Sequence, residues 1–172
     1  MSNLSPETAR ILSASYMSTL WRRFFGLNLS RIDQLLYVGG EFRAAQWSAM
    51  HRLGIRAVLS LQAERADTFS EPPPERTLRL MVPDFHAPTL EQLAEGVAFI
   101  AQAHAAQLPV LVHCRAGVGR APTTAAAYLV AHHSMTSQEA VTSIYQARPI
   151  IGMNIIQMQR LRQWEQQQRL QH

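Results

Sequence analysis

Residues 109–120 read Pro-Val-Leu-Val-His-Cys-Arg-Ala-Gly-Val-Gly-Arg, and this stretch decides the fold. Its apolar beginning, Pro109–Val112, is short enough to be a buried strand. The residues that follow it, Ala121–Val130, predict a helix with Pro122 in the first turn, where proline removes no hydrogen bond. The sequence therefore predicts a strand, a loop with two glycines and a helix N-terminus in direct succession.

The loop of this stretch begins at Cys114 and ends at Arg120, and its chemistry favours an oxyanion. Backbone N–H groups in such a loop can converge on one point, and the helix N-terminus adds partial positive charge. The arginine side chain can hold two oxygens of a phosphate, and the same field favours the nucleophilic thiolate form of the cysteine. We predict that Cys114 attacks a phosphoryl group held by Arg115, Ala116, Gly117, Val118, Gly119 and Arg120.

A structural role is the alternative for this cysteine, because a lone cysteine at a strand end is usually a small buried hydrophobic residue. The complete pattern His-Cys-x-x-Gly-x-x-Arg from His113 to Arg120 favours catalysis. It resembles the phosphate loop of the cysteine-based protein tyrosine phosphatases, specifically their dual-specificity branch, and the resemblance extends from Arg31 to Trp164. The resemblance implies a metal-independent phosphomonoesterase that needs no cofactor and forms a phosphocysteine. It also implies a supporting role for His113, whose counterpart in the family orders the loop by hydrogen bonding.

A phosphatase of this kind needs a general acid, because an alkoxide leaves poorly unless it is protonated. Asp84 follows a predicted strand, so we expect it at the same edge of the sheet as Cys114. The resembling family carries its acid on such a loop, often as Asp-x-x-x-Pro, and Pro88 completes that pattern. Asp84 as a turn cap, and His86 or Glu91 as the acid, are weaker interpretations.

The residue after the loop arginine departs from the family pattern. The family usually has serine or threonine there, and its hydroxyl stabilises the thiolate that leaves when the phosphoenzyme is hydrolysed; this chain has Ala121. Thr124, one turn later, is a candidate to compensate. We expect an active but slower enzyme, and a phosphate-binding pseudophosphatase that docks a phosphorylated partner remains the alternative.

The substrate is less sharply indicated than the reaction. Arg115 adds charge at the loop rim, and Cys-basic-Ala-Gly resembles the lipid-directed members of the family. The approach Arg31-Ile32-Asp33, before residues 35–39, also resembles the phosphatidylglycerophosphate phosphatases of mitochondria. In related sequences, a glutamine at the position of Gln157 lies near the loop and orients water, which implies a supporting role here. A phospholipid of phosphatidylglycerophosphate or phosphoinositide type and a phosphotyrosine or phosphoserine protein both remain candidate substrates.

Strand patterns alternate with helix patterns along the rest of the chain, and this order predicts an α/β domain. We expect a single domain with a central, mainly parallel sheet of about four or five strands flanked by helices, as in dual-specificity phosphatases. Residues 64–75, which contain three successive prolines, predict a stiff, exposed loop. The expected strands cover 35–38, 55–61, 77–82 and 109–113, and the expected helices cover 42–53, 89–106, 121–130, 136–147 and a last segment from 154.

We expect residues 1–29 to be an amphipathic helical segment ahead of a dual-specificity phosphatase catalytic domain at 30–172. Residues 15–25 have helical periodicity with an apolar, aromatic face. Packing on the domain's own core is our first interpretation, and peripheral contact with a membrane interface is the alternative. The pair Arg22-Arg23 argues against a membrane span.

Composition narrows the class of protein and its partners. A single cysteine excludes an internal disulfide and suits a reducing compartment, which favours a cytoplasmic location, with a peripheral membrane location as the alternative. Residues 1–31 and 115–172 are net basic and 32–114 net acidic, which favours an anionic partner. No nucleic-acid motif is present, so a lipid or other phosphoester ranks above nucleic acid. His132-His133 lacks a third ligand at suitable spacing, so we expect no metal site.

Overall fold

The structure is a computed structural model that describes residues 13–21 and 26–171. Its sheet has five strands in the order β1-β2-β5-β3-β4. All neighbouring strands are parallel except the edge pair β1–β2. The single α/β domain with a mainly parallel sheet is thus confirmed. The strands are β1 (Leu29–Arg31), β2 (Leu36–Gly39), β3 (Ala57–Ser60), β4 (Arg76–Arg79) and β5 (Val110–His113).

Strand β5 lies at the centre of the sheet because every one of its residues can be buried. All four residues of Val110–His113 are buried. In the pairing register, His113 lies opposite Gly39 of β2 on one side and Ser60 of β3 on the other. The carboxyl ends of these three parallel strands therefore meet at one edge, and the Cys114 loop leaves the sheet there.

Two details of the sheet differ from the prediction. Strand β1 was not predicted, because its three residues give no measurable alternation of apolar and polar side chains. Strand β4 ends at Arg79 and not at Val82. Leu80 and Val82 are nevertheless buried. The alternation that predicted a longer strand therefore reflects the burial of these two side chains, which follow the last residue paired with β3.

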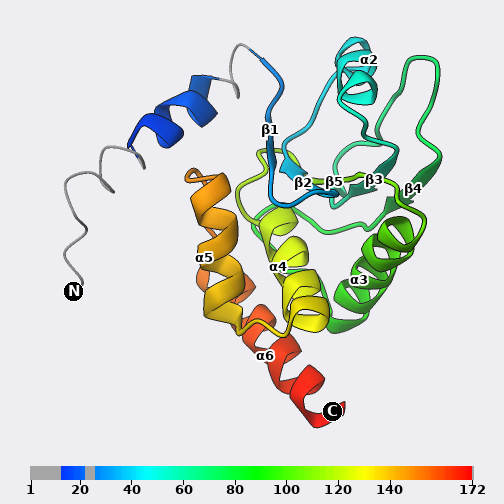
Figure 1. Ribbon diagram of the computed structural model, residues 1–172. Coiled ribbons are helices and arrows are strands. Elements are labelled where there is room, and N and C mark those ends of the chain that lie inside the picture. Colours follow the sequence, from blue (N-terminus) through cyan, green and yellow to red (C-terminus); the bar gives the residue numbers. More distant parts are fainter. Residues whose placement is uncertain (1–12, 22–25, 172) are drawn as a thin grey trace.

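Helices cover both faces of the sheet (Figure 1). Helix α2 packs on one face with the buried side chains of Trp47 and Met50, which contact Val58 and Leu111 of the sheet. The other face carries the larger core, in which α4 contacts α3, α5 and α6. The helices are α2 (Ala44–Arg52), α3 (Leu90–Ala105), α4 (Arg120–His133), α5 (Ser137–Ala147) and α6 (Ile155–Gln171).

Helix ends follow local capping chemistry. Thr136 accepts a hydrogen bond from the amide of Glu139, whose side chain accepts one from the Thr136 amide, so the predicted capping box of α5 is confirmed. Helix α6 begins in the same way, since Asn154 and Gln157 each accept a hydrogen bond from the other's amide (2.9 and 3.0 Å). This second box fixes the residues at the start of α6 that face the site described below.

The structure describes a helix at residues 13–21, which overlaps the helix predicted at 15–25, and the remaining predicted residues, 22–25, lie outside the described part of the chain. Tyr16, Met17 and Trp21 are 43%, 63% and 64% exposed. This exposure disagrees with the interpretation that the apolar face packs on the domain's own core. Among the described helices, none has the length and apolar content needed to cross a membrane.

Candidate active site

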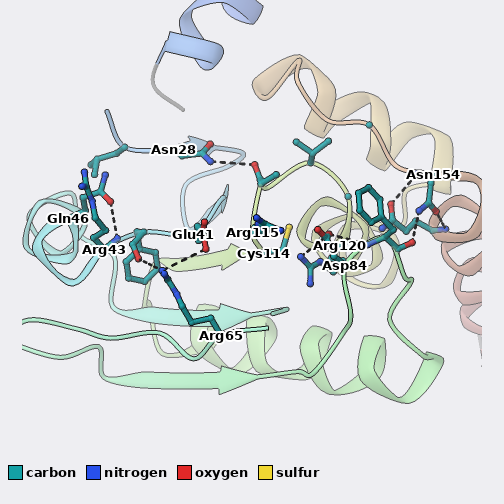
Figure 2. Close-up of a pocket in the computed structure, with 18 of the residues that line it drawn as sticks. Asn28, Glu41, Arg43, Gln46, Arg65, Asp84, Cys114, Arg115, Arg120 and Asn154 are labelled. Atoms are coloured by element: carbon teal, nitrogen blue, oxygen red, sulfur yellow. Dashed lines mark hydrogen bonds and ion pairs between the residues drawn. The ribbon is translucent and has the colours of Figure 1, made fainter. Parts of the chain in front are cut away.

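A pocket of about 1230 Å³ opens at the edge of the sheet where β5 ends (Figure 2). It brings together the two segments that the sequence predicts to carry the chemistry, since both Cys114 and Asp84 line it. Five of the six predicted phosphate-binding residues line it as well, Gly117 being the exception. The lining from these segments and from α6 comprises Cys114, Arg115, Ala116, Val118, Gly119, Arg120, Asp84, Phe85, Asn154 and Gln157.

The backbone of the loop is oriented by hydrogen bonds on its outer side. Each of the five successive carbonyls from Arg115 to Gly119 accepts a hydrogen bond from a group outside this run. In a planar trans peptide the N–H points opposite to the C=O, so the amides of residues 116–120 are directed to the inner side of the loop. The donors are, in order, the amide of Glu41 (3.0 Å), Arg148 Nη2 (3.2 Å), Arg148 Nε (2.7 Å), the amide of Gly152 (2.9 Å) and the amide of Thr123 (3.0 Å).

Arg148 holds two of these carbonyls from beneath the loop. Its side chain is completely buried at the end of α5 and also donates to Asn28 Oδ1 (2.6 Å). Gly117, whose carbonyl it binds, has a φ of +68°, and a Cβ there would lie 2.3 Å from the Gly39 oxygen. The loop therefore needs glycine at 117 for both conformation and space. Sequence reasoning assigned Arg148 no role, because nothing local to it indicates a partner 31 residues away.

Cys114 lies at the base of this cradle. Its side chain is 3% exposed, and its amide donates to the Gly39 carbonyl (3.4 Å), the last rung between β5 and β2. The residue thus sits at the junction between a rigid central strand and the inward-facing amides. Such a position offers an anion donors on several sides and places the sulfur next to it.

Arg120 closes the loop with a buried guanidinium that is 1% exposed. Its Nη1 is fixed by both carboxylate oxygens of Glu64 (3.0 and 2.9 Å) and by the Val82 carbonyl (2.7 Å). Its Nη2 lies 3.0 Å from Asp84 Oδ1. One nitrogen of the fork is therefore anchored to the protein scaffold, and the other meets the predicted general acid.

Glu64 is a site residue that the sequence did not reveal. Partial burial by itself raises the pKa of this carboxyl, but the hydrogen bonds from Arg120 and from the Asp84 amide outweigh it and leave the pKa below its ordinary value. The carboxylate is therefore ionised near neutral pH and serves as a charged anchor for Arg120. It also accepts the amide of Asp84 (2.7 Å), which ties the acid loop to the same anchor.

The loop that carries Asp84 is held against the phosphate loop by two side-chain amides at the start of α6. Asn154 Nδ2 donates to the Phe85 carbonyl (2.6 Å), and Gln157 Nε2 donates to the His86 carbonyl (3.0 Å). Gln157 is buried and lies at the pocket, where it was predicted. Asn154 was predicted only as a helix start, since its partner is 69 residues away.

Among the three acids considered from the sequence, Asp84 is the one that the structure brings to Arg120, and its side chain is 36% exposed. The weaker candidates occupy other positions. His86 is exposed and its Nδ1 contacts the Asp84 carbonyl (2.9 Å), while Glu91 is exposed in the first turn of α3. Neither belongs to the pocket lining formed by the described residues.

His113 is completely buried but is bonded differently from the expectation. Its Nε2 lies 2.8 Å from Asp67 Oδ2, in the segment predicted as an exposed loop, and not at hydrogen-bond distance from the phosphate loop. Its ring also packs edge-on against Phe42 (5.1 Å between centroids). The loop at 64–75 has no buried residue and most of its residues are exposed, as predicted, while Asp67 and Phe69 are half-buried because they turn toward this polar and aromatic cluster.

Ala121 is completely buried in the first turn of α4, directly behind the loop. The two nearest hydroxyls on that helix are engaged with its own backbone. Thr124 Oγ1 donates to the Arg120 carbonyl (3.2 Å), and Thr123 Oγ1 donates to the Gly119 carbonyl (2.9 Å). The structure thus gives Thr124 a backbone partner and shows no contact between it and Cys114.

Arginines surround the pocket on the side of α2. Arg43, Arg65 and Arg115 are exposed and all line the pocket, and Arg65 lies 3.7 Å from Glu41. In the described part of the chain, no group of three or more histidine, cysteine, aspartate or glutamate side chains is placed to hold a metal ion. The reactive groups at the site are a thiol, a guanidinium, two carboxyls and oriented amides.

Comparisons with known proteins agree with this geometry. The family model described as the dual specificity phosphatase catalytic domain matches residues 36–167. The human dual specificity protein phosphatase 12 is 34% identical over 122 residues, which cover 69% of this chain and 36% of that protein. The Drosophila melanogaster dual specificity protein phosphatase Mpk3 is 29% identical over 140 residues, or 81% of this chain and 34% of that protein. The chain thus spans about a third of the length of these curated relatives.

Solved structures match this fold over most of this chain and nearly all of their own. The crystal structure of PTPMT1 in complex with PI(5)P superposes with a TM-score of 0.76 at 25% identity and covers 84% of this chain and 98% of that chain. The structure of Tk-PTP in its active form has a TM-score of 0.73 at 26% identity and covers 81% of this chain and 97% of that chain.

Proposed function

Since this chain belongs to the dual-specificity phosphatase family, we propose that it hydrolyses phosphate monoesters through a phosphocysteine intermediate on Cys114. The arrangement of three residues is the observation that supports this proposal most strongly. Cys114 and Arg120 begin and end a loop whose amides are directed to its inner side. Asp84 lies 3.0 Å from Nη2 of Arg120, the nitrogen that Glu64 does not bind. The site thus combines a nucleophile, an anion cradle and an acid in one pocket.

In the first step, the Cys114 thiolate attacks phosphorus and the bond to the leaving oxygen breaks. Asp84, entering in its protonated form, donates its proton to that oxygen, so that an alcohol departs. The inward amides and Arg120 hold the three remaining phosphoryl oxygens in the equatorial plane of the transition state and stabilise the charge spread over them.

In the second step, a water molecule attacks the phosphocysteine. Asp84, now a carboxylate, takes a proton from the water, the sulfur–phosphorus bond breaks, and inorganic phosphate and the Cys114 thiolate result. Gln157 lies beside the loop with its Nε2 on the acid loop, and we assign it the orientation of this water. His113, the last residue of β5, supports the site indirectly through its bond to Asp67 in the loop at 64–75.

Substrate binding at Arg120 is an exchange of anions. Nη2 of Arg120 is paired with Asp84, while its Nη1 is anchored by Glu64. An incoming phosphate competes with the Asp84 carboxylate for Nη2. Its binding releases Asp84 toward the leaving oxygen, where the first step requires the acid.

A phospholipid monoester is the substrate class that we propose. Three exposed arginines, Arg43, Arg65 and Arg115, line the pocket and suit an anionic headgroup. The similar structure of PTPMT1 was solved with PI(5)P, which is consistent with a lipid substrate. Phosphotyrosine and phosphoserine proteins are the competing substrates. A pseudophosphatase is disfavoured because Cys114 and Asp84 both remain at the site.

Hydrolysis of an aryl phosphate in the presence of EDTA tests the reaction. We expect turnover in the wild type and none in Cys114→Ser, which should still bind vanadate, because the cradle is unchanged. Arg120→Lys should lose most activity, since a point charge cannot replace a planar fork with separate partners on two nitrogens. Turnover in Cys114→Ser comparable to the wild type would refute the mechanism. Phosphate release from a panel of phospholipids, phosphoinositides and phosphopeptides then identifies the substrate class.

A further inference from the structure

Large apolar side chains are exposed beside the mouth of the catalytic pocket. Phe85, next to the general acid, is 78% exposed, and Ile155 and Ile156 in the first turn of α6 are 72% and 54% exposed. We refer to these three side chains as the apolar rim. Its two segments are in direct contact, because Asn154, the residue before Ile155, donates to the Phe85 carbonyl (2.6 Å).

The exposure of Phe85 is maintained by the surrounding structure. Its φ is +61°, a left-handed conformation that is unfavourable for a bulky residue. Hydrogen bonds hold it there, since its amide donates to Asp84 Oδ1 (3.1 Å) and its carbonyl accepts from Asn154. Strained residues of this kind persist where neighbouring contacts fix them, often at functional sites. The ring is therefore presented to solvent by a defined backbone.

An apolar hollow continues the surface away from the pocket. It measures about 370 Å³, lies between α5 and α6, and is lined by side chains that include Tyr145, Ile151 and Met153. Gly152 lines both this hollow and the catalytic pocket. The hollow therefore adjoins the catalytic pocket at Gly152.

The opposite side of the pocket carries positive charge. Figure 2 shows Arg43 and Arg65 on one side of Cys114 and Asn154 on the other, with Arg115 between them. The mouth is therefore flanked by arginines at one edge and by the apolar rim at the other. A surface that combines cations with exposed aliphatic and aromatic side chains is complementary to an anionic phospholipid interface.

We propose that the apolar rim docks the pocket mouth on an anionic phospholipid bilayer, with Phe85, Ile155 and Ile156 inserted into the interface. This rests on the proposed function, because it takes a membrane lipid as the substrate. Phe85 lines the pocket, so a protein seated on the rim, including a second copy of this chain, would obstruct the entrance. A bilayer instead delivers its headgroup phosphates to that entrance.

The test compares two serine variants on the same helix. Ile155→Ser/Ile156→Ser removes the aliphatic part of the rim, and Leu170→Ser is the matched control, since Leu170 is 89% exposed at the far end of α6. Binding is measured by co-sedimentation with phosphatidylcholine vesicles that contain phosphatidylglycerol. We expect the double variant to bind about tenfold more weakly or worse, the control to bind as the wild type, and Ile155→Leu/Ile156→Leu to retain binding.

Hydrolysis of a soluble aryl phosphate separates this proposal from the proposed function. Its kcat/KM should be equal in all four proteins, because neither isoleucine lines the pocket. Equal vesicle binding by the wild type and the double serine variant would overturn the docking proposal, as would a change in molar mass by light scattering that showed the rim to join two copies. Vesicle binding that depends on the rim, without aryl phosphate hydrolysis by the wild type, would instead leave docking standing and refute the enzymatic function.

Discussion

Replacing Ala121 with serine should accelerate the second chemical step. Ala121 follows the loop arginine and is completely buried, and the hydroxyls of Thr123 and Thr124 donate to backbone carbonyls. In the proposed mechanism, the thiolate that leaves the phosphocysteine therefore lacks the hydroxyl that the resembling family usually provides. The barrier for breaking the sulfur–phosphorus bond should be raised more than the barrier for forming it, so the phosphoenzyme should accumulate.

The magnitude follows from a single hydrogen bond to a charged sulfur. Such a bond is worth roughly 1–3 kcal/mol, which corresponds to about five- to 160-fold in rate. Serine adds one oxygen at a fully buried position, whereas threonine also adds a methyl group, and overpacking a core typically costs 1–3 kcal/mol of stability. Ala121→Ser is therefore the cleaner substitution. Its hydroxyl should be accommodated without a large fall in Tm if it finds the Cys114 sulfur as a partner.

Stopped-flow measurement with an aryl phosphate checks this prediction. The wild type should release a burst of phenol followed by slower steady turnover, and Ala121→Ser should raise kcat and shrink the burst. Thr124→Val serves as the control, because its hydroxyl bonds to the Arg120 carbonyl and its loss should leave the burst unchanged. The reasoning is refuted if the wild type shows no burst and the serine variant gains no rate, or if Thr124→Val alone slows the second step.

Three further perturbations have distinct expected results. Asp84→Asn should slow hydrolysis of alkyl phosphates strongly and of phosphates with good phenolic leaving groups less, and equal losses across a leaving-group series would exclude Asp84 as the acid. Arg148→Lys should lower the free energy of unfolding by roughly 3 kcal/mol and weaken vanadate binding, because one ammonium cannot bind both loop carbonyls. Calorimetry measures the first effect and titration with vanadate the second, and an unchanged vanadate affinity would contradict the role of Arg148. Burial lowers the pKa of His104 from 6.5, so its contribution to stability is present above that pH and is lost as the pH falls below it. The Tm should therefore fall as the pH decreases below 6.5, and it should fall less in His104→Gln. Parallel curves of Tm against pH for the two proteins would disprove the contribution.

The sequence predicts those parts of the fold and site that are encoded locally. The order of strands and helices follows from periodicity, and the central place of β5 follows from its unbroken apolar run. Cys114 and Arg120 lie in one contiguous motif, and Asp84 lies in a short pattern after a strand. These signals need no knowledge of distant contacts.

The residues that the sequence did not reveal act across long separations. Glu64 contacts Arg120 over 56 positions, Asn154 contacts Phe85 over 69, and Arg148 contacts the loop over 31. Each stands in a segment whose local pattern indicates only a polar loop or a helix end. Their roles depend on which segments the sheet order brings together, and periodicity does not encode that.

The solitary cysteine has a consequence for how the protein responds to oxidants. Peroxide converts a reactive thiolate to sulfenic acid, which is commonly rescued by a disulfide with a second cysteine nearby. Cys114 is the only cysteine of this sequence, so that rescue cannot occur within it. Recovery requires either a backbone nitrogen of the loop, which would form a sulfenamide, or an external thiol such as glutathione. An external thiol must enter through the pocket mouth, because the sulfur is almost completely buried. Whatever occupies that mouth will therefore also govern whether oxidative inactivation is reversed or proceeds to the sulfinic acid.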